Sequence, residues 1–370
     1  MRIAYIGLRG VPANYSGIER AVEEIGSRLV QNGHEVTVYC MNSAYIDRVQ
    51  VYKGMNLRYV STIPSKNLEM LIYSLISSMT SCFQNYDIVH FHALGPAVMS
   101  FLPKFLGRKT VVTIHGLDWK REKWGGAAKV YLKLGEKAAC LFPHTTIVVS
   151  ESLRNYFKTR YGRNTEYIPN GVALQTPHPL KDTRRFGIEE ARYILFVARL
   201  TPEKNVHQLI EAFQEIPTDF KLVIVGSAGH LDDYQLILQR LADNDSRVIL
   251  TGAQHGETLA ELFSNAYLFV LPSALEGLPI ALLEAMSFGI PALVSDIPEN
   301  LEVIDNGGER CGFTFKVGSV ESLRNTLASV LEQGDDVKKI GSKGQSLVAS
   351  KYNWDIVAEQ TERVYMDLLQ

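Results

Sequence analysis

The 370-residue sequence predicts an α/β protein built from two doubly wound, Rossmann-like domains. Two observations predict this fold class. Short apolar, β-rich segments alternate with amphipathic, helix-compatible segments, and the whole alternation begins again near the middle of the chain. Alternation of this kind is typical of a parallel sheet with helices on both faces. A chain of this length is also too long for one ordinary hydrophobic core, so two domains of similar size are expected.

The first domain is expected over residues 1–169 and the second over residues 170–350. The predicted strands of the first are RIAYIG, EVTVYC, YDIVHFH, KTVVTIH and TTIVVS. After a polar, proline-containing segment, the strands of the second are YILFVAR, FKLVIVG, RVILTG, YLFVLP and IPALVS. An amphipathic helix over 351–370 ends the chain. Ligands of such sheets bind beyond the carboxyl ends of the strands, so we expect two domains that face each other across a cleft.

The composition favours a cytoplasmic protein. The start MRIAYIGLRG is a strand pattern without the features of a signal peptide. No stretch reaches about 18 uninterrupted apolar residues, so no membrane span is expected. The four cysteines are far apart and form no C-x-x-C pair, which disfavours both a zinc site and a disulfide framework.

The two halves of the chain differ in charge. Residues 1–170 contain 21 Lys and Arg against 12 Asp and Glu, whereas the remainder contains 17 against 28. Much of the positive excess lies in segment 119–137, where six basic residues are interleaved with Trp119, Trp124 and Tyr131. Such a segment can lie on an anionic membrane surface. It can equally be an ordinary solvated helix face.

A nicotinamide enzyme is the obvious candidate for two such domains, but the first turn does not fit it. The glycines after the first strand are Gly7, Gly10 and Gly17, which is not the G-x-G-x-x-G spacing. No acidic residue ends the second strand to bind a ribose. Gly17 lies where a helix opens, so backbone N–H groups there can meet a phosphate or a sugar. A structural turn glycine is the alternative.

The second domain places two cations at the mouth of its sheet. Arg199 ends the first strand, and Lys204 lies near the start of the next helix. Fixed positive charge and helix N-termini stabilise a departing diphosphate, and an Arg and a Lys can do this without a metal. Asp243 and Asp245 match the sequence pattern of a metal-binding D-x-D pair. They lie in a polar helix-to-strand connection, so no metal site is expected.

The segment SALEGLPIALLEAM contains two glutamates on either side of a helix start. Glu276 is expected in the loop and Glu284 inside the helix, with Pro279 as the first helical residue. Gly277 and Leu278 present backbone N–H groups there, and the helix dipole favours an anion. The carboxylates can accept hydrogen bonds from sugar and ribose hydroxyls. The alternative is one loop residue and one exposed helix residue.

Taken together, ARLTPEKN and SALEGLPIALLEAM resemble the donor-site pattern of the retaining glycosyltransferases of family four, which have the GT-B fold. The likeness covers nearly the whole chain. It includes the Asn170-Gly171 turn and a Trp-bearing terminal helix, which in that family packs back on the first domain. The opening RIAYIGLRGVPANYSGIE is similar to an N-terminal domain of bacterial transferases of cell-surface polysaccharide, rhamnosyltransferases among them.

The resemblance implies roles for residues of the second domain. Arg199 and Lys204 hold the diphosphate and stabilise the leaving group. Glu276 contacts hydroxyls of the donor sugar, and Glu284 binds the nucleotide ribose. The Gly-Leu-Pro segment 277–279 presents amides to sugar or phosphate.

In the first domain, the resemblance implies that Gly17 lies in a loop that approaches the donor and that His115 lies at the sugar. His115 ends a strand, where an imidazole can donate to a hydroxyl; a satisfied core histidine is the alternative. His90 and His92 also end a strand but receive no role from the resemblance. The sequence departs from the family pattern at Asn205, where a glycine often follows the lysine, and at the serine before Gly17.

The resemblance thus implies a retaining transferase that needs no metal or cofactor and binds no nucleic acid. It moves a hexose or deoxyhexose from a nucleotide-diphosphate sugar to a saccharide or lipid-linked acceptor. The expected location is the cytoplasm, and the basic segment 119–137 is the candidate contact with the inner face of the cytoplasmic membrane. The donor is expected on the second domain and the acceptor on the basic first domain. No residue must be a covalent nucleophile, so front-face displacement is expected.

Two classes of alternative remain. One is a sugar-nucleotide epimerase, or a protein of this fold that binds a sugar nucleotide without transferring the sugar. The other is a glycosidase, which uses two carboxylates across the scissile bond. A glycosidase has no need of Arg199 and Lys204.

Overall fold

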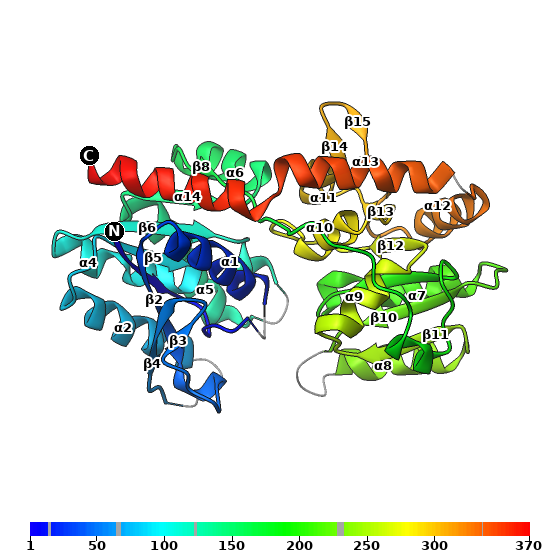
Figure 1. Ribbon diagram of the computed structural model, residues 1–370, viewed down its shortest axis with the longest axis horizontal. Helices are drawn as coiled ribbons and strands as arrows, with labels where there is room; N and C mark the ends of the chain where they lie inside the picture. The colour runs from blue at the N-terminus through cyan, green and yellow to red at the C-terminus, as the bar shows by residue number, and fades with distance from the viewer. Residues whose placement is uncertain (14–15, 64–67, 122–123, 228–232, 335) are drawn as a thin grey trace. The chain divides into compact units, whose positions relative to one another are not determined.

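The computed structural model describes residues 1–13, 16–63, 68–121, 124–227, 233–334 and 336–370 (Figure 1). The chain divides into two compact units: the first comprises 1–171 and 354–370, and the second 172–353. The boundaries therefore lie slightly later than the sequence predicts. The reason is local pairing: Val172 N donates to Tyr352 O (2.6 Å), and Val172 forms a parallel bridge with Asn353, which keeps these residues in the second unit.

The first unit contains an eight-stranded sheet in the order β3-β4-β2-β1-β5-β6-β7-β8. All neighbours run parallel except β3 and β4. The central strands are buried along almost their whole length, which explains their nearly continuous apolar sequences. The strands are β1 (Arg2–Ile6), β2 (Glu35–Met41), β3 (Val51–Tyr52), β4 (Met55–Val60), β5 (Ile88–His92), β6 (Lys109–Ile114), β7 (Thr145–Val148) and β8 (Glu166–Tyr167).

The helices of the first unit lie in two layers. The chain runs from β1 to β2 toward one edge of the sheet, and from β4 through β8 toward the other. Because such crossovers are right-handed, α1 lies on one face and α2 to α6 on the opposite face. The helices are α1 (Gly17–Gln31), α2 (Glu69–Cys82), α3 (Leu94–Ala97), α4 (Phe101–Phe105), α5 (Gly126–Leu141), α6 (Glu151–Tyr161) and α14 (Trp354–Leu369), with short 3₁₀ turns η1 (Asn42–Ala44), η2 (Val98–Ser100) and η3 (Asp118–Lys120).

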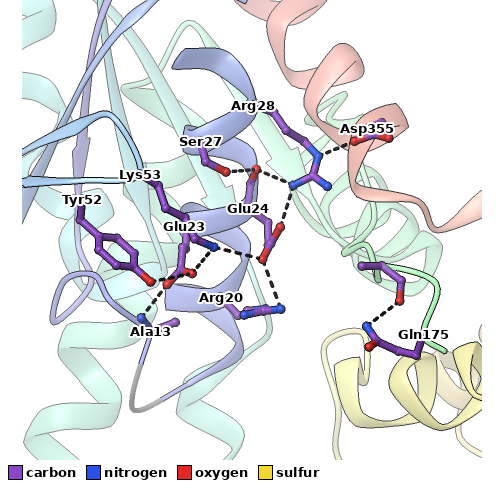
Figure 2. Close-up of polar contacts among 11 residues, drawn as sticks. Ala13, Arg20, Glu23, Glu24, Ser27, Arg28, Tyr52, Lys53, Gln175 and Asp355 are labelled. Carbon is purple, nitrogen blue, oxygen red and sulfur yellow. Dashed lines mark hydrogen bonds and ion pairs between the residues drawn. The ribbon is translucent and has the colours of Figure 1, made fainter. Parts of the chain in front are cut away.

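Helix α14 packs beside α1, so the prediction that the terminal helix returns to the first domain is confirmed (Figure 1). Arg28 Nε donates to Asp355 Oδ1 (2.5 Å), a contact drawn in Figure 2. Glu362 accepts from Asn32 Nδ2 (2.6 Å) and contacts His34 Nε2 (2.7 Å). These polar contacts at the rim fix the register of a helix whose buried side faces the core.

The second unit contains a six-stranded parallel sheet in the order β11-β10-β9-β12-β13-β16. Its strands are β9 (Tyr193–Val197), β10 (Lys221–Val225), β11 (Val248–Gly252), β12 (Leu268–Leu271), β13 (Ala292–Ser295) and β16 (Phe313–Phe315), with a separate hairpin of β14 (Asp305–Asn306) and β15 (Glu309–Arg310). Its helices are α7 (Val206–Gln214), α8 (Asp233–Asp243), α9 (Gly256–Ser264), α10 (Ile280–Ser287), α11 (Pro298–Ile304), α12 (Val320–Glu332) and α13 (Asp336–Lys351), with turns η4 (Asp182–Phe186) and η5 (Pro202–Lys204).

Each sheet has one point at which the strand order reverses. In the first unit it lies between β1 and β5, and in the second between β9 and β12. Loops that leave such neighbouring strands diverge to opposite faces, which leaves a crevice at the carboxyl edge where ligands bind. Among the described helices, none is long and apolar enough to cross a membrane.

Tyr365 is the residue of α14 that reaches deepest into the first unit. Its hydroxyl contacts Tyr5 Oη (3.1 Å) and His90 Nδ1 (2.5 Å), and all three side chains are buried. We expect Tyr365→Phe to lower the free energy of unfolding of this unit by about 1–3 kcal/mol, because a buried ring nitrogen then lacks its partner. Urea unfolding monitored by tryptophan fluorescence measures it, since Trp119, Trp124 and Trp354 all lie in the first unit.

The matched control is Glu359→Gln on the same helix. Glu359 is 69% exposed in its pair with Arg363, so its loss should change stability by less than about 0.5 kcal/mol. Equal unfolding curves for Tyr365→Phe and the unsubstituted protein would contradict the role given to the hydroxyl.

Candidate active site

In the second unit, two loops meet at the point where the strand order reverses. One follows β9 and carries Arg199 and Lys204; the other follows β12 and carries Glu276. Their backbones are joined directly, because Ala274 N donates to Glu203 O (2.9 Å). Residues that are distant in the sequence therefore form a single rim at this edge of the sheet.

Lys204 and Glu276 form an ion pair at this rim. The Lys204 ammonium contacts Glu276 Oε1, and the two side chains are only 14% and 9% exposed. Removing two charges from water is costly, and their mutual attraction offsets that cost only while both partners are present. The site thus contains a weakly hydrated cation and a weakly hydrated anion, each neutralised by the other.

The structure explains why Asn205 can replace the glycine that often follows the lysine. Asn205 adopts the left-handed conformation, with φ of +52°, between η5 and α7. Asparagine tolerates this conformation better than most residues with a side chain. Its Nδ2 also donates to Pro272 O (3.1 Å), which ties the β9 loop to the β12 loop a second time.

The start of α10 lies one residue later than the sequence predicts. Pro279 is the N-cap rather than the first helical residue, because its ψ of 101° is extended and its carbonyl accepts from Leu282 N (3.1 Å). The amides of Gly277 and Leu278 therefore belong to the loop before the helix. Glu284 is half-buried in the second turn, and Arg199 is exposed just beyond β9.

A buried polar cluster that the sequence reasoning missed supports the β12 loop. Ser295 donates to the carbonyl of Ser273, and Asn300 Nδ2 donates to Ser295 Oγ (2.9 Å). The side-chain hydroxyl of Ser273 and Oδ1 of Asn300 are buried and have no partner among the described residues. Ser273 lies two residues after the end of β12, a strand at the reversal point, and this position is the signal that could have found it.

In the first unit, three histidines gather at the ends of β5 and β6. His92 Nδ1 lies 3.0 Å from His115 Nε2, and the rings of His90 and His92 stack with centroids 4.3 Å apart. His90 Nε2 also contacts Thr113 Oγ1 (2.7 Å). Sequence reasoning gave a role to His115 alone, because only the fold brings the three rings together.

Burial keeps these imidazoles neutral. It lowers the pKa of His90 from 6.5 to about 3, with a smaller contribution from His115. It lowers the pKa of His115 to about 4, and that of His92 well below its ordinary value. At neutral pH the cluster therefore carries no charge and acts only through hydrogen bonds.

Gly17 is the first residue of α1 and is exposed, as a residue that meets a ligand must be. Ser16 N donates to Glu19 Oε2 (2.9 Å). Ala13 N donates to Glu23 Oε2 (2.8 Å), which anchors the loop from β1 (Figure 2). Desolvation raises the pKa of Glu23, but hydrogen bonds from Lys53 and Ala13 outweigh it and the pKa is lowered. Two carboxylates at this helix start make it better suited to sugar hydroxyls than to a phosphate.

The Asp243–Asp245 segment does not resemble a metal site. Asp245 forms an ion pair with Arg247 (2.7 Å), and the hydrogen bond from Arg247 lowers the pKa of its carboxyl. Within the described ranges, no group of three His, Cys, Asp or Glu side chains is arranged to hold a metal ion.

Segment 119–137 forms η3 and most of α5, with residues 122–123 outside the described chain. Glu136 is buried and accepts hydrogen bonds from Trp119, Tyr156 and Tyr161, and Lys133 lies over the Trp119 ring (4.8 Å). On its inner face, the segment therefore carries a carboxylate that is hydrogen-bonded and surrounded by aromatic rings. Its outer face is left with lysines and aliphatic side chains.

Comparison with known proteins identifies the family and the fold to which the chain is similar. The family model described as "Glycosyltransferase Family 4" matches residues 15–176, and the one described as "Glycosyl transferases group 1" matches residues 181–347. The fold class is also that of solved structures. Sucrose-phosphate synthase from Thermosynechococcus elongatus superposes with a TM-score of 0.84 at 21% identity, over 99% of this chain and 98% of that chain. Anabaena HepE in complex with UDP and glucose gives 0.82 at 19%, over 99% and 100%.

Two curated relatives match over nearly their full length. The UDP-Gal:α-D-GlcNAc-diphosphoundecaprenol α-1,3-galactosyltransferase of Escherichia coli is 26% identical over 100% of this chain and 97% of its own. The α-maltose-1-phosphate synthase of Mycobacterium tuberculosis is 26% identical over 99% of both. The chain belongs to the family-four glycosyltransferases and has the GT-B fold. The predicted fold and enzyme class are confirmed.

The neutral histidines make the first unit sensitive to acid. His90 is neutral when folded down to about pH 3, whereas the unfolded chain binds its proton near 6.5, so this contribution is present above pH 6.5 and is lost as the pH falls toward 3. Between pH 7 and 5 we expect a loss of about 2 kcal/mol from His90 alone. Urea unfolding followed by tryptophan fluorescence should show a smaller loss in His90→Asn.

The control for the acid effect is His255→Gln, because His255 is exposed in the second unit. That variant should keep the full pH dependence. If His90→Asn and His255→Gln lose the same stability between pH 7 and 5, His90 does not carry the effect.

Proposed function

We propose that the protein is a retaining, metal-independent glycosyltransferase that moves a hexose or deoxyhexose from a nucleotide-diphosphate sugar to a saccharide or lipid-linked acceptor. The observation that carries this proposal is the Lys204–Glu276 pair at the reversal point of the second sheet. The Escherichia coli relative named above, whose donor is UDP-Gal and whose acceptor is a diphosphoundecaprenol-linked sugar, supports the substrate class.

The ion pair is suited to a ligand that carries both negative charge and hydroxyls. A diphosphate oxygen can replace Glu276 as the partner of Lys204. The carboxylate released from the lysine then accepts hydrogen bonds from hydroxyls of the sugar. Glu284 in α10 accepts from the ribose in the same way. The exchange leaves no buried charge without a partner, which is the condition for such a site to bind without a large penalty.

In the reaction, negative charge develops on the phosphate oxygen as its bond to the anomeric carbon breaks. Lys204 and Arg199 stabilise that charge, and low exposure strengthens the interaction at Lys204. The acceptor hydroxyl forms its bond to the anomeric carbon on the face that the phosphate leaves, and its proton passes to the departing phosphate oxygen. Configuration is thereby retained without a covalent intermediate.

The ion pair also favours transfer over the two alternatives. In a glycosidase, Glu276 would need a second carboxylate across the scissile bond. Its partner is an ammonium instead, which suits the binding of a phosphorylated donor. An epimerase has no use for an acceptor, so product analysis with and without one separates the two activities.

We expect Arg199→Ala and Lys204→Ala each to lower the rate of sugar transfer by roughly 10²–10³, because each removes a group that stabilises the leaving charge. The assay uses labelled UDP-, GDP- and dTDP-sugars with a polyprenyl-diphosphate-linked saccharide, and follows product in the presence and absence of acceptor.

Arg240→Ala is the matched control for this assay, since Arg240 is exposed on α8 of the same unit and should keep the full rate. Transfer at an unchanged rate in both the Arg199 and Lys204 variants would refute the donor-site assignment. Release of free sugar without nucleotide would instead indicate a glycosidase.

We further propose that the first unit rests on an anionic membrane surface through the outer face of α5. Val130 and Leu134 are 60% and 54% exposed there, and Leu141, the last residue of the helix, is 70% exposed. Lys133 and Lys137 are exposed between them. The one acidic residue of α5, Glu136, is buried, so its outer face combines apolar side chains with positive charge only.

Two other helices of the first unit also expose apolar side chains. Phe105, after which α4 ends, is 81% exposed, and α4 adjoins the end of α5 through the Phe101 and Phe142 rings, whose centroids lie 5.5 Å apart. Helix α2 has no charged residue from position 70 to 82, and Phe83 at its end is 82% exposed. Large exposed apolar side chains gathered on one unit are typical of an interaction site.

Replacing two lysines of α5 tests this proposal. Each lysine near an anionic surface contributes about 1 kcal/mol, so Lys133→Gln with Lys137→Gln should weaken binding to vesicles containing phosphatidylglycerol by roughly 30-fold. Co-sedimentation measures it, with phosphatidylcholine vesicles as the uncharged reference. The double variant Lys338→Gln with Lys351→Gln, in exposed positions of the second unit, should bind unchanged. Equal binding by both double variants would exclude α5 as the contact.

A further inference from the structure

His92 is a buried histidine for which the proposed mechanism has no use. It is 2% exposed, and its Nδ1 contacts His115 Nε2 (3.0 Å). Its other nitrogen, Nε2, is buried and has no partner among the described residues. His115 is half-buried, and its Nδ1 makes no hydrogen bond within the described part of the chain. One nitrogen of His115 is therefore occupied by His92, and the other is available to a ligand.

Only two proton arrangements fit this contact, because both rings are neutral. In the first, His92 Nδ1–H donates to His115 Nε2, and His115 carries its own proton on Nδ1. In the second, His115 Nε2–H donates to His92 Nδ1, and His92 carries its proton on the partnerless Nε2. The first arrangement makes His115 Nδ1 a donor to the ligand, and the second makes it an acceptor.

The surroundings of His92 favour the first arrangement. The second leaves a buried N–H group without an acceptor, which is rarer in proteins than a buried lone pair without a donor. A small cavity of about 20 Å³ adjoins the cluster, and aliphatic and polar side chains contribute about equally to its lining. The polar side chains include Thr113, Asn170 and Thr361, but none of these makes a hydrogen bond with His92 Nε2. A buried ring nitrogen without a proton costs less at such a place than an unpaired N–H group.

We propose that His92 is a positioning residue that fixes His115 as the neutral Nδ1–H tautomer, so that His115 donates a hydrogen bond from Nδ1 to an oxygen of the bound sugar. This inference rests on the proposed function for the identity of the ligand. The tautomer itself is a property of the free protein. A His115 fixed in this form cannot accept the acceptor's proton at Nδ1, which agrees with passing that proton to the departing phosphate.

The test is the ¹⁵N spectrum of the ligand-free full chain labelled at histidine, with His115 assigned from its loss in His115→Gln. Long-range ¹H–¹⁵N correlations distinguish a protonated Nδ1 from a protonated Nε2. We expect Nδ1–H in the unsubstituted protein. A proton on Nε2 of His115 would overturn the proposal, whatever the transfer assay shows.

Three substitutions at position 92 separate positioning from mere packing. In His92→Asn the amide Nδ2 can donate in place of the ring Nδ1, so the Nδ1–H tautomer should persist. In His92→Asp the carboxylate can only accept, so the tautomer should reverse. In His92→Leu the preference should disappear. The same tautomer in Asn, Asp and Leu variants that are folded by tryptophan fluorescence would refute the role of His92.

Kinetics with the donor that the transfer assay identifies give an independent readout. We expect kcat to fall about three- to tenfold in His92→Leu and to recover in His92→Asn, since one hydrogen bond to the sugar is lost and restored. A fall that Asn does not restore would show that His92 acts through packing alone. If no donor supports transfer, the proposed function fails while the measured tautomer still decides the inference on His92.

Discussion

The handedness of the crossovers is the constraint on which the rest of this structure depends. Parallel crossover connections in proteins are right-handed in nearly all cases, so a chain that reverses its direction across a sheet places its helices on the opposite face. The reversal occurs once in each sheet, between β1 and β5 and between β9 and β12. At these points the loops that leave neighbouring strands diverge. The Lys204–Glu276 pair lies at one reversal point, and the His92–His115 pair lies beside the other.

Polar side chains are shielded from water at both reversal points, and each sheet offsets the cost of that burial in a different way. In the second unit, opposite charges neutralise each other, which keeps a cation and an anion ready to exchange partners. In the first unit, burial removes the charge, and the imidazoles are left with directional hydrogen bonds. A charged site suits a diphosphate and a neutral one suits hydroxyls. This difference fits a donor on the second unit and a sugar-directed role for His115.

Helix α14 connects the end of the chain to this neutral cluster. Its Tyr365 hydroxyl lies against His90 and Tyr5, at the centre of the first unit. The first strand and the last helix of the chain thus contribute to the same hydrophobic core. The terminal helix is therefore part of the layer that buries the histidines.

The sequence by itself determined the fold class and the family, and it supplied the residues of the proposed donor loop. Strand and helix periodicity follow from local physics, and Arg199, Lys204, Glu276 and Glu284 lie at fixed spacings around strand ends. Other features depend on contacts between distant segments, and local pattern carries no information on these. The sequence could not show that Lys204 and Glu276 are paired, because β9 and β12 become neighbours only through the strand order.

The tertiary structure also decided the partners of His115, the shift of the α10 start to Ile280, and which face of α5 remains exposed. The partner of His115 is set by a hydrogen bond across the fold, and the exposed face of α5 is set by burial. The start of α10 follows from the extended ψ of Pro279. The sequence around a histidine at a strand end is the same whether the side chain contacts water or another imidazole. Only the packing of β5 beside β6 turns three scattered histidines into one cluster.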